Sequence, residues 1–188
     1  MDSSRKEKLR LETAEAYKAV GEFVVQFEHL SYAMKNKIRH IIGMSKAIDV
    51  LLEPYTFRQT IDVLKKLISL RTETWKKDHP DIELYKLLMK DLNKLNNDRN
   101  TTIHSMWYIG WSGDKTETTS EFYGHKFNGS IKNSSTKEIR YLTEKCKNLH
   151  SVFWTLWSVD DPRIKRDFMF ADIYSRSENG FWSRKNIK

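Results

Sequence analysis

The chain has 188 residues, a length that suits a single domain with a sizeable buried core. Its 39% hydrophobic residues argue against a disordered chain, and no apolar run approaches the roughly 18 residues that a membrane-spanning helix needs. The formal net charge of +8 favours a polyanionic partner such as nucleic acid, although an excess of solvated surface lysine is also common. Cys146 is the single cysteine, so no internal disulfide can form, and the polar first residues do not resemble a signal peptide. We therefore expect a cytoplasmic protein with no membrane association.

Helical spacing of apolar residues predicts long helices in the first half of the chain. Residues 5–43 predict one long helix or two in series, with an apolar stripe formed by Phe23, Phe27, Leu30, Met34 and Ile38. A second helix is predicted over residues 56–71. Thr56 is its candidate N-cap, and Gln59 stands three positions later, as a capping box requires.

The second half predicts two more helices with a β excursion between them. A third helix is predicted from Asp81, as a candidate N-cap, to Arg99, with a leucine seam at Leu84, Leu88, Leu92 and Leu95. Alternating aromatic and aliphatic residues over 107–111 and 121–127 predict a short hairpin or an irregular β excursion, and residues 132–136 are polar. A fourth helix is expected from the capping box Ser135-x-x-Glu138 to the break before Pro162, with Cys146 on its apolar face.

Four amphipathic helices, each with one apolar face, bury those faces most simply as a bundle. The predicted fold class is all-α: a bundle of four to five helices with a short β-hairpin-like insertion between the third and fourth core helices.

The end of the third predicted helix carries the most informative polar cluster, Asn97-Asp98-Arg99-Asn100-Thr101-Thr102-Ile103-His104. Arg99 can grip a phosphate with two donors, and His104 can transfer a proton near neutral pH. Together they suffice to cleave a phosphodiester without a metal ion. The alternative is structural: Arg99 pairs with a carboxylate and His104 caps a helix end.

This region resembles the HEPN domains, helical bundles of which many are metal-independent endoribonucleases in toxin–antitoxin, abortive-infection and antiviral defence systems. Their R-x4-6-H signature corresponds to Arg99 and His104, with the polar Asn100 directly after the arginine. The resemblance covers about residues 15–158 of the single 1–188 domain and leaves the C-terminal extension 159–188 without an assigned role. Ser105 stands where a glycine often follows the histidine of the family.

The resemblance implies three catalytic residues. His104 would transfer protons, Arg99 would stabilise the charge that develops on the phosphate, and Asn100 would orient the histidine or the substrate. Residues five apart on an ideal helix differ by about 140° around its axis, so one straight helix does not aim Arg99 and His104 at one phosphate. Either the helix is distorted there or two copies of the motif meet, as in family members that dimerise. We expect a homodimer with a composite cleft.

Other polar residues are weaker candidates. Lys90 and Lys94 could follow an RNA backbone or form a solvated helix face, and Asn97 could shape the cleft or end the helix. Trp107 could stack a base or pack into the core. Glu28 is a possible accessory acid, a surface acid or a partner for Arg99.

The leading hypothesis is therefore an RNA-cleaving enzyme that acts as a toxin or defence effector, with RNA, a second copy and an antitoxin or regulatory protein as partners. A non-catalytic HEPN-like module that binds RNA, nucleotide or protein is the alternative, and a plain helical interaction domain is a third hypothesis. The other histidines show no metal-ligand spacing and no phosphate-binding glycine loop occurs, so we expect neither metal nor cofactor.

Overall fold

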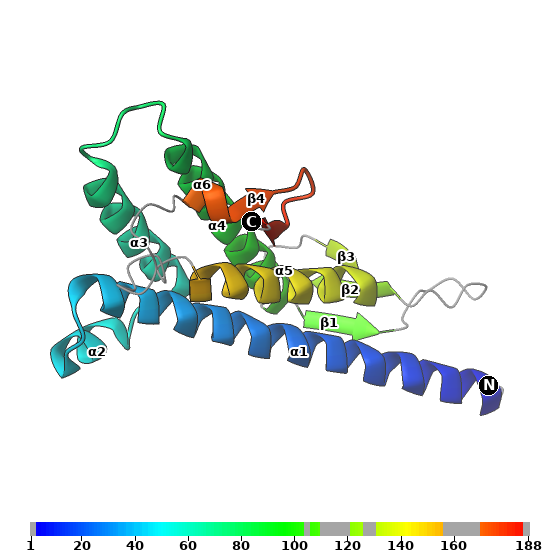
Figure 1. Cartoon of the computed structure of the whole chain (residues 1–188). Helices are drawn as coiled ribbons and strands as arrows, with labels where there is room; N and C mark the ends of the chain where they lie inside the picture. The colour runs from blue at the N-terminus through cyan, green and yellow to red at the C-terminus, as the bar shows by residue number, and fades with distance from the viewer. Residues whose placement is uncertain (1–2, 104–105, 110–120, 126–130, 156–169, 186–188) are drawn as a thin grey trace. The chain divides into compact units, whose positions relative to one another are not determined.

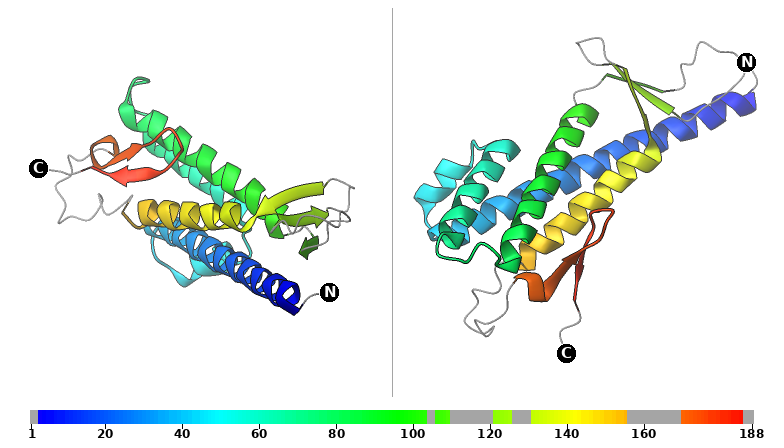
Figure 2. Two further views of the ribbon diagram at one scale, coloured as in Figure 1. Left: turned by 90° about the vertical axis from the view of Figure 1, so that its right-hand side faces the viewer. Right: turned by 90° about the horizontal axis from the view of Figure 1, so that it is seen from above.

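The computed structural model describes residues 3–103, 106–109, 121–125, 131–155 and 170–185. The predicted fold class is confirmed, because the molecule is all-α with a short β insertion between α4 (Pro80–Ile103) and α5 (Thr136–Thr155) (Figures 1 and 2). The chain divides into two compact units. Unit 1 comprises Met1–Phe27 and Asn97–Glu144, and unit 2 comprises Glu28–Asn96 and Lys145–Lys188. None of the helices in the described ranges is both long and apolar enough to cross a membrane.

The first predicted helix is a single helix, α1 (Ser3–Ile42). It stops where Gly43 adopts a φ of +115°, a conformation that glycine takes without a side-chain clash, and the Gly43 amide donates to the Arg39 carbonyl at 2.9 Å. The short helix α2 (Lys46–Leu52), which the periodicity did not predict, then begins at the N-cap Ser45, whose hydroxyl accepts from the Ile48 amide at 3.3 Å.

Local capping determines where three further helices begin. The predicted capping box of Thr56 and Gln59 opens α3 (Phe57–Thr72), and that of Ser135 and Glu138 opens α5. The prediction that Asp81 caps the third helix is wrong. Pro80 occupies the first position of α4, and the His79 Nδ1 atom accepts from the Asp81 amide at 3.3 Å.

The insertion forms a three-stranded antiparallel sheet in the order β1-β2-β3, comprising β1 (Met106–Ile109), β2 (Glu121–His125) and β3 (Ile131–Ser135). Tyr108 faces Tyr123 between the first two strands, and Tyr123 faces Asn133 between the last two. The predicted hairpin is therefore present, and the polar segment over 131–135 adds a third strand that the sequence patterns did not indicate. Backbone N–H and C=O groups form the hydrogen bonds between strands, so a polar segment can become a strand once a partner strand lies beside it.

Both units have a buried core on the predicted stripes. In unit 1 the buried side chains include Phe23 and Phe27 of α1 and Ile139 of α5. In unit 2 the α1 stripe continues, and the other helices add further fully buried residues: Leu30, Met34, Ile38, Ile61, Leu64, Leu88, Leu92, Leu149 and Phe153. Cys146 belongs to this core, and burial raises the pKa of its thiol to about 12, so the thiol stays protonated and unreactive.

The C-terminal extension also belongs to unit 2. After the short helix α6 (Phe170–Ile173), strands β4 (Tyr174–Arg176) and β5 (Trp182–Arg184) form an antiparallel hairpin. Asp81 anchors it, because the carboxylate accepts from the backbone amides of Phe170 at 2.9 Å and Ala171 at 2.7 Å. This explains why Asp81, 3% exposed, does not serve as a helix cap.

Candidate functional site

Arg99 and Asn100 lie on the last turn of α4, inside unit 1. Arg99 is half-buried and Asn100 is exposed. The Arg99 Nη1 atom donates to the Asn100 Oδ1 atom at 3.3 Å, and the guanidinium carbon lies 5.4 Å from the centroid of the Phe27 ring. The two polar residues that open the predicted motif are thus in contact with each other.

The Phe27 ring is a fixed platform for the guanidinium group. Phe27 is 3% exposed on α1, and its ring meets that of Phe23 edge-on, with centroids 6.2 Å apart. A guanidinium over an aromatic face gains electrostatic attraction and loses freedom of movement, while its N–H donors stay in the plane of the group. Such an arginine retains the donor geometry that a phosphate oxygen pair requires.

The structure describes less of the other predicted site residues. His104 lies outside the described residues. Trp107 lies on β1 opposite Gly124, and only its backbone is described. Because α4 is helical through Ile103, the relation between Arg99 and the histidine depends on the path of the chain beyond that residue.

The other weaker candidates lie on α4 and α1. Lys90, Lys94 and Asn97 lie on α4, and nine residues of helix place Lys90 about 180° around the axis from Arg99. Glu28 is exposed on α1 and forms no ion pair in the part of the chain that the structure describes, which agrees with a surface acid. Lys90 instead lines a cavity in unit 2.

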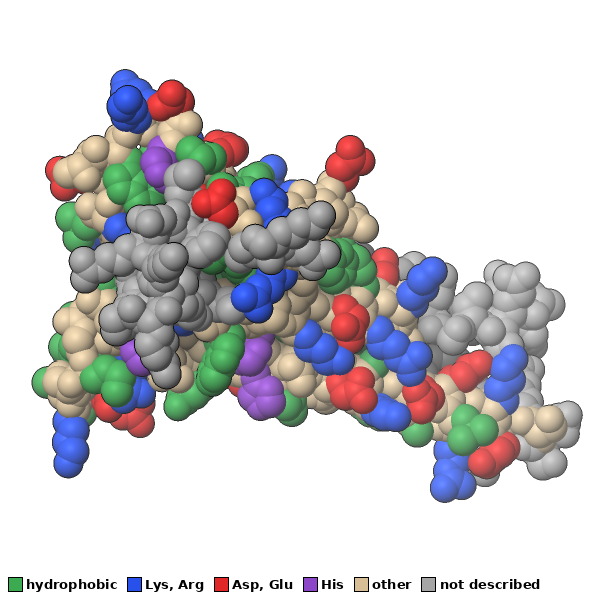
Figure 3. All heavy atoms as spheres, viewed as in Figure 1, with side chains coloured by type: hydrophobic (Ala, Val, Ile, Leu, Met, Phe, Trp, Pro, Cys, Tyr) green, Lys and Arg blue, Asp and Glu red, His purple; other side chains and the backbone are tan. Residues whose placement is uncertain are grey.

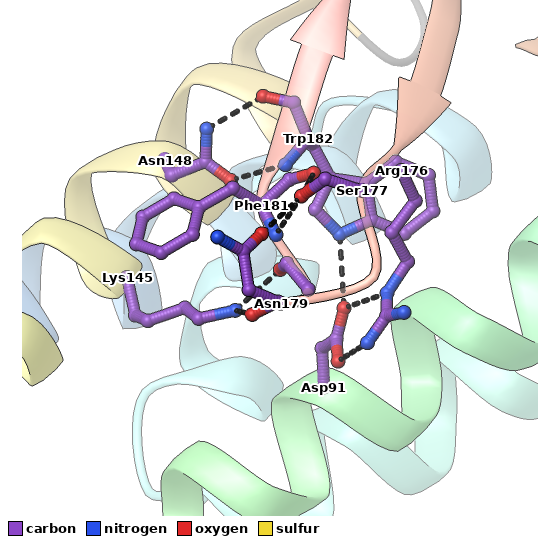
Figure 4. A network of polar contacts seen from close by, with 9 residues as sticks. Asp91, Lys145, Asn148, Arg176, Ser177, Asn179, Phe181 and Trp182 are labelled. Atoms are coloured by element: carbon purple, nitrogen blue, oxygen red, sulfur yellow. Dashed lines mark hydrogen bonds and ion pairs between the residues drawn. The ribbon is translucent and has the colours of Figure 1, made fainter.

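Unit 2 contains a second polar cluster, which the sequence patterns did not indicate (Figure 4). Asp91 of α4 accepts a two-pronged ion pair from Arg176, through Nε at 2.8 Å and Nη2 at 2.7 Å. The Trp182 indole donates to the same carboxylate at 3.0 Å. A carboxylate 10% exposed thus receives three N–H donors, which compensates for its removal from water.

Two residues of α5 extend this cluster to the backbone of the hairpin. The Asn148 side chain accepts from the Trp182 amide at 2.8 Å and donates to the Trp182 carbonyl at 2.7 Å. The Lys145 ammonium donates to the carbonyls of Asn179, at 3.0 Å, and Gly180. Burial lowers the pKa of Lys145, and the Asp91 carboxylate opposes that shift. Because these groups bind one another, the cluster anchors the hairpin to α4 and α5 within unit 2.

One sequence signal could have revealed this hairpin. Asn179-Gly180 is a common turn pair between two short runs, and Gly180 adopts a φ of +79°. A side chain at that position would also meet the Lys145 Nζ atom at 2.7 Å. The β pairing was therefore predictable from the turn, whereas the partner Asp91 was not.

The charge of the described surface is partly balanced locally. In Figure 3 basic and acidic side chains alternate along the N-terminal part of α1. Lys8 lies 4.0 Å from Glu12, and Arg10 lies 3.8 Å from Glu7. Within the described residues, no three histidine, cysteine or acidic side chains gather closely enough to hold a metal ion.

Comparisons with models of known protein families, with curated proteins and with solved structures found no match for this chain.

Proposed function

We propose that the protein is a metal-independent endoribonuclease that uses Arg99, Asn100 and His104. The contact between Arg99 and Asn100 on the last turn of α4 carries the proposal, because it pairs a phosphate-binding cation with an amide that is close in sequence to the proton-transfer residue. The Phe27 platform supports it, since a guanidinium held over a ring face loses freedom of movement before a phosphate binds.

The proposed reaction is an internal attack within the RNA. His104 removes the proton of the ribose 2′-hydroxyl, the 2′-oxygen bonds to phosphorus, and the bond from phosphorus to the 5′-oxygen breaks. An acid returns a proton to the leaving 5′-oxygen. Arg99 stabilises the negative charge on the phosphate oxygens, and Asn100 orients the reacting groups. The products carry a 2′,3′-cyclic phosphate and a 5′-hydroxyl.

A homodimer would supply both the base and the acid from its two copies of His104. The resemblance to the HEPN domains motivates this part of the proposal, because family members that dimerise bring two copies of the motif into one cleft. A fully active protein that is strictly monomeric would contradict it. As a toxin or defence effector, the protein would also need a neutralising or regulatory partner.

The test is cleavage of end-labelled single-stranded RNA, with a chelator present, by the wild type and by His104→Ala. Loss of general acid–base catalysis should lower the cleavage rate by about 100- to 10,000-fold. His40→Ala is the matched control, because His40 is an exposed histidine on α1, and this variant should cleave at the wild-type rate. An RNA with a 2′-deoxy sugar at the cleaved position should resist both active proteins.

Either of two results would contradict the proposed ribonuclease activity of Arg99 and His104. Equal cleavage by the wild type and His104→Ala would reveal another catalytic centre or a contaminant. No cleavage by a folded, dimeric wild type across several RNAs would favour the non-catalytic binding module, which gel-shift titration with the same RNAs then tests directly.

A further inference from the structure

A cavity of about 500 Å³ opens between α3 and α4 within unit 2. This volume lies in the range of small-molecule sites, roughly 300–1,000 Å³. Its lining is mostly apolar and includes Ile68 of α3 and Ile82, Tyr85 and Met89 of α4. The size and lining suit the body of a small organic molecule.

The cavity results from the residues that the two facing helices present. On α3 the small side chains of Ser69 and Thr72 stand beside Ile68, and the Thr72 hydroxyl donates to the Ile68 carbonyl at 2.9 Å. Small side chains on one wall leave the space between α3 and α4 unfilled. In Figure 1 these two helices are successive elements joined by the 73–79 connection.

Two residues that line the cavity are held in place by residues that do not line it. The Tyr85 ring stacks on that of Phe170, with centroids 5.3 Å apart and planes inclined by 9°. The Asn93 side chain accepts from Arg58 of α3 at 2.7 Å and donates to the Met89 carbonyl at 2.6 Å, which links the two helices. The cavity is therefore preformed, and a ligand would lose little of its binding free energy in ordering it.

The rim of the cavity is basic. Lys65 comes from α3, and Lys86 and Lys90 come from α4. Asp62 lies 3.8 Å from Lys65 and Glu83 lies 3.6 Å from Lys86, but both are exposed pairs within one helix, which bind weakly. Lys90 has no ion-pair partner in the described part of the chain. An incoming anion would thus meet three ammonium groups and displace only weak pairs.

We propose that this cavity binds a small amphipathic organic oxyanion, with its apolar body on Ile82, Tyr85 and Met89 and its oxyanion against Lys86 and Lys90. Among the described residues of the proposed catalytic set, neither Arg99 nor Asn100 lines this cavity. The inference does not depend on ribonuclease activity, and its test does not use RNA.

The probe is 8-anilinonaphthalene-1-sulfonate, an aromatic sulfonate whose fluorescence rises in apolar sites. The wild type should bind one equivalent saturably, with lower affinity at high salt. Lys86→Gln with Lys90→Gln should raise the dissociation constant about five- to tenfold, as expected for two partly exposed charge contacts. Lys66→Gln with Lys77→Gln is the matched control, because both lysines are exposed and lie outside the cavity, and it should bind as the wild type does.

Two further measurements separate the contribution of the apolar body of the ligand to binding from that of its charge. Ser69→Trp should fill the cavity and abolish binding of both the sulfonate and its uncharged analogue N-phenyl-1-naphthylamine, while circular dichroism reports an unchanged helix content. Octyl phosphate or octanoate should displace the probe, whereas sodium phosphate at the same concentration should not.

The proposal fails if a folded Ser69→Trp protein binds the probe as the wild type does. It also fails if the two lysine pairs have equal effects, or if inorganic phosphate displaces the probe as well as octyl phosphate does.

Discussion

Arg176 in unit 2 and Arg99 in unit 1 show two uses of the same side chain. The Arg176 guanidinium makes a two-pronged ion pair with Asp91, a carboxylate that also accepts from the Trp182 indole. The contacts described for Arg99 are with the face of the Phe27 ring and the amide oxygen of Asn100. A carboxylate binds two in-plane N–H donors of an arginine, whereas an aromatic face contacts the flat side of the guanidinium.

A structural arginine and a candidate functional arginine differ in the partners of the guanidinium group. Arg176 and Asp91 have side chains 20% and 10% exposed, and they come from segments 85 residues apart, so the pair holds tertiary structure together. The contacts described for Arg99, with its chain neighbour and an aromatic face, are weaker than a two-pronged ion pair. Substituting each arginine should therefore affect different measurements.

The largest expected effect is on catalysis by Arg99→Ala. Removing the group that stabilises the developing phosphate charge should lower the RNA cleavage rate by about 100- to 1,000-fold, measured under single-turnover conditions. Loss of the cation–π contact with Phe27 should by itself remove about 0.5–1 kcal/mol of unfolding free energy. Arg99→Lys should recover part of the rate, because it restores the charge without the fork. A collapse of stability in Arg99→Ala would place this arginine in the same structural class as Arg176.

Next in size is the stability effect of Arg176→Ala. It leaves the Asp91 carboxylate shielded from water without its cation, and should cost about 2–3 kcal/mol in urea unfolding, somewhat below the roughly 3–5 kcal/mol measured for fully buried pairs. Arg140→Ala is the control in unit 1. It breaks an ion pair with Glu15 whose side chains are more than half exposed, so the loss should stay below about 1 kcal/mol. Equal losses would remove the distinction between the two kinds of pair.

A smaller effect should come from the two capping boxes, one in each unit. Thr56→Ala in unit 2 and Ser135→Ala in unit 1 each remove a side-chain acceptor for a backbone amide, and each should cost about 1 kcal/mol. Thr56→Ser and Ser135→Thr should restore most of it. Urea midpoints that differ strongly between the two alanine variants would show that the units differ in how far they depend on local capping.

The smallest effect should be a dependence on pH that belongs to unit 2. Burial lowers the pKa of His150 below its ordinary 6.5, and the nearby His29 lowers it further. The unfolded chain therefore binds more protons near pH 6, so this contribution to stability is present above pH 6.5 and is lost as the pH falls towards the folded-state pKa. His150→Gln should reduce the shift in urea midpoint between about pH 7.5 and pH 5.5. His40→Gln, at an exposed position, should leave that shift unchanged.

Much of the secondary structure was predictable because its causes are local. Phe23, Leu30 and Ile38 recur at helical spacing, and all three are buried on α1. Thr56 with Gln59 and Ser135 with Glu138 mark helix starts through contacts three residues apart. Arg99 and Asn100 were singled out from the sequence by their types and spacing, and their role in phosphate chemistry stays a prediction.

Two departures from the sequence patterns have a common cause in competition from distant partners. Asp81 has the right type and place for a helix cap, but its carboxylate binds the backbone of Phe170 and Ala171 instead. The segment 131–135 has the composition of a polar connection, yet β2 supplies the ladder that makes it a strand. In both cases a partner outside the local segment decided the structure.

Helix positions and core stripes thus depend on the order of residues alone, because periodicity and capping act over three or four positions. The roles of Asp91 and of the cavity between α3 and α4 do not. Asp91 meets Trp182 across 91 residues of chain, and Lys65 and Lys90 reach one rim only because their helices face each other. Such contacts between residues distant in sequence depend on how the apolar faces of the helices pack, and no local sequence pattern encodes that packing.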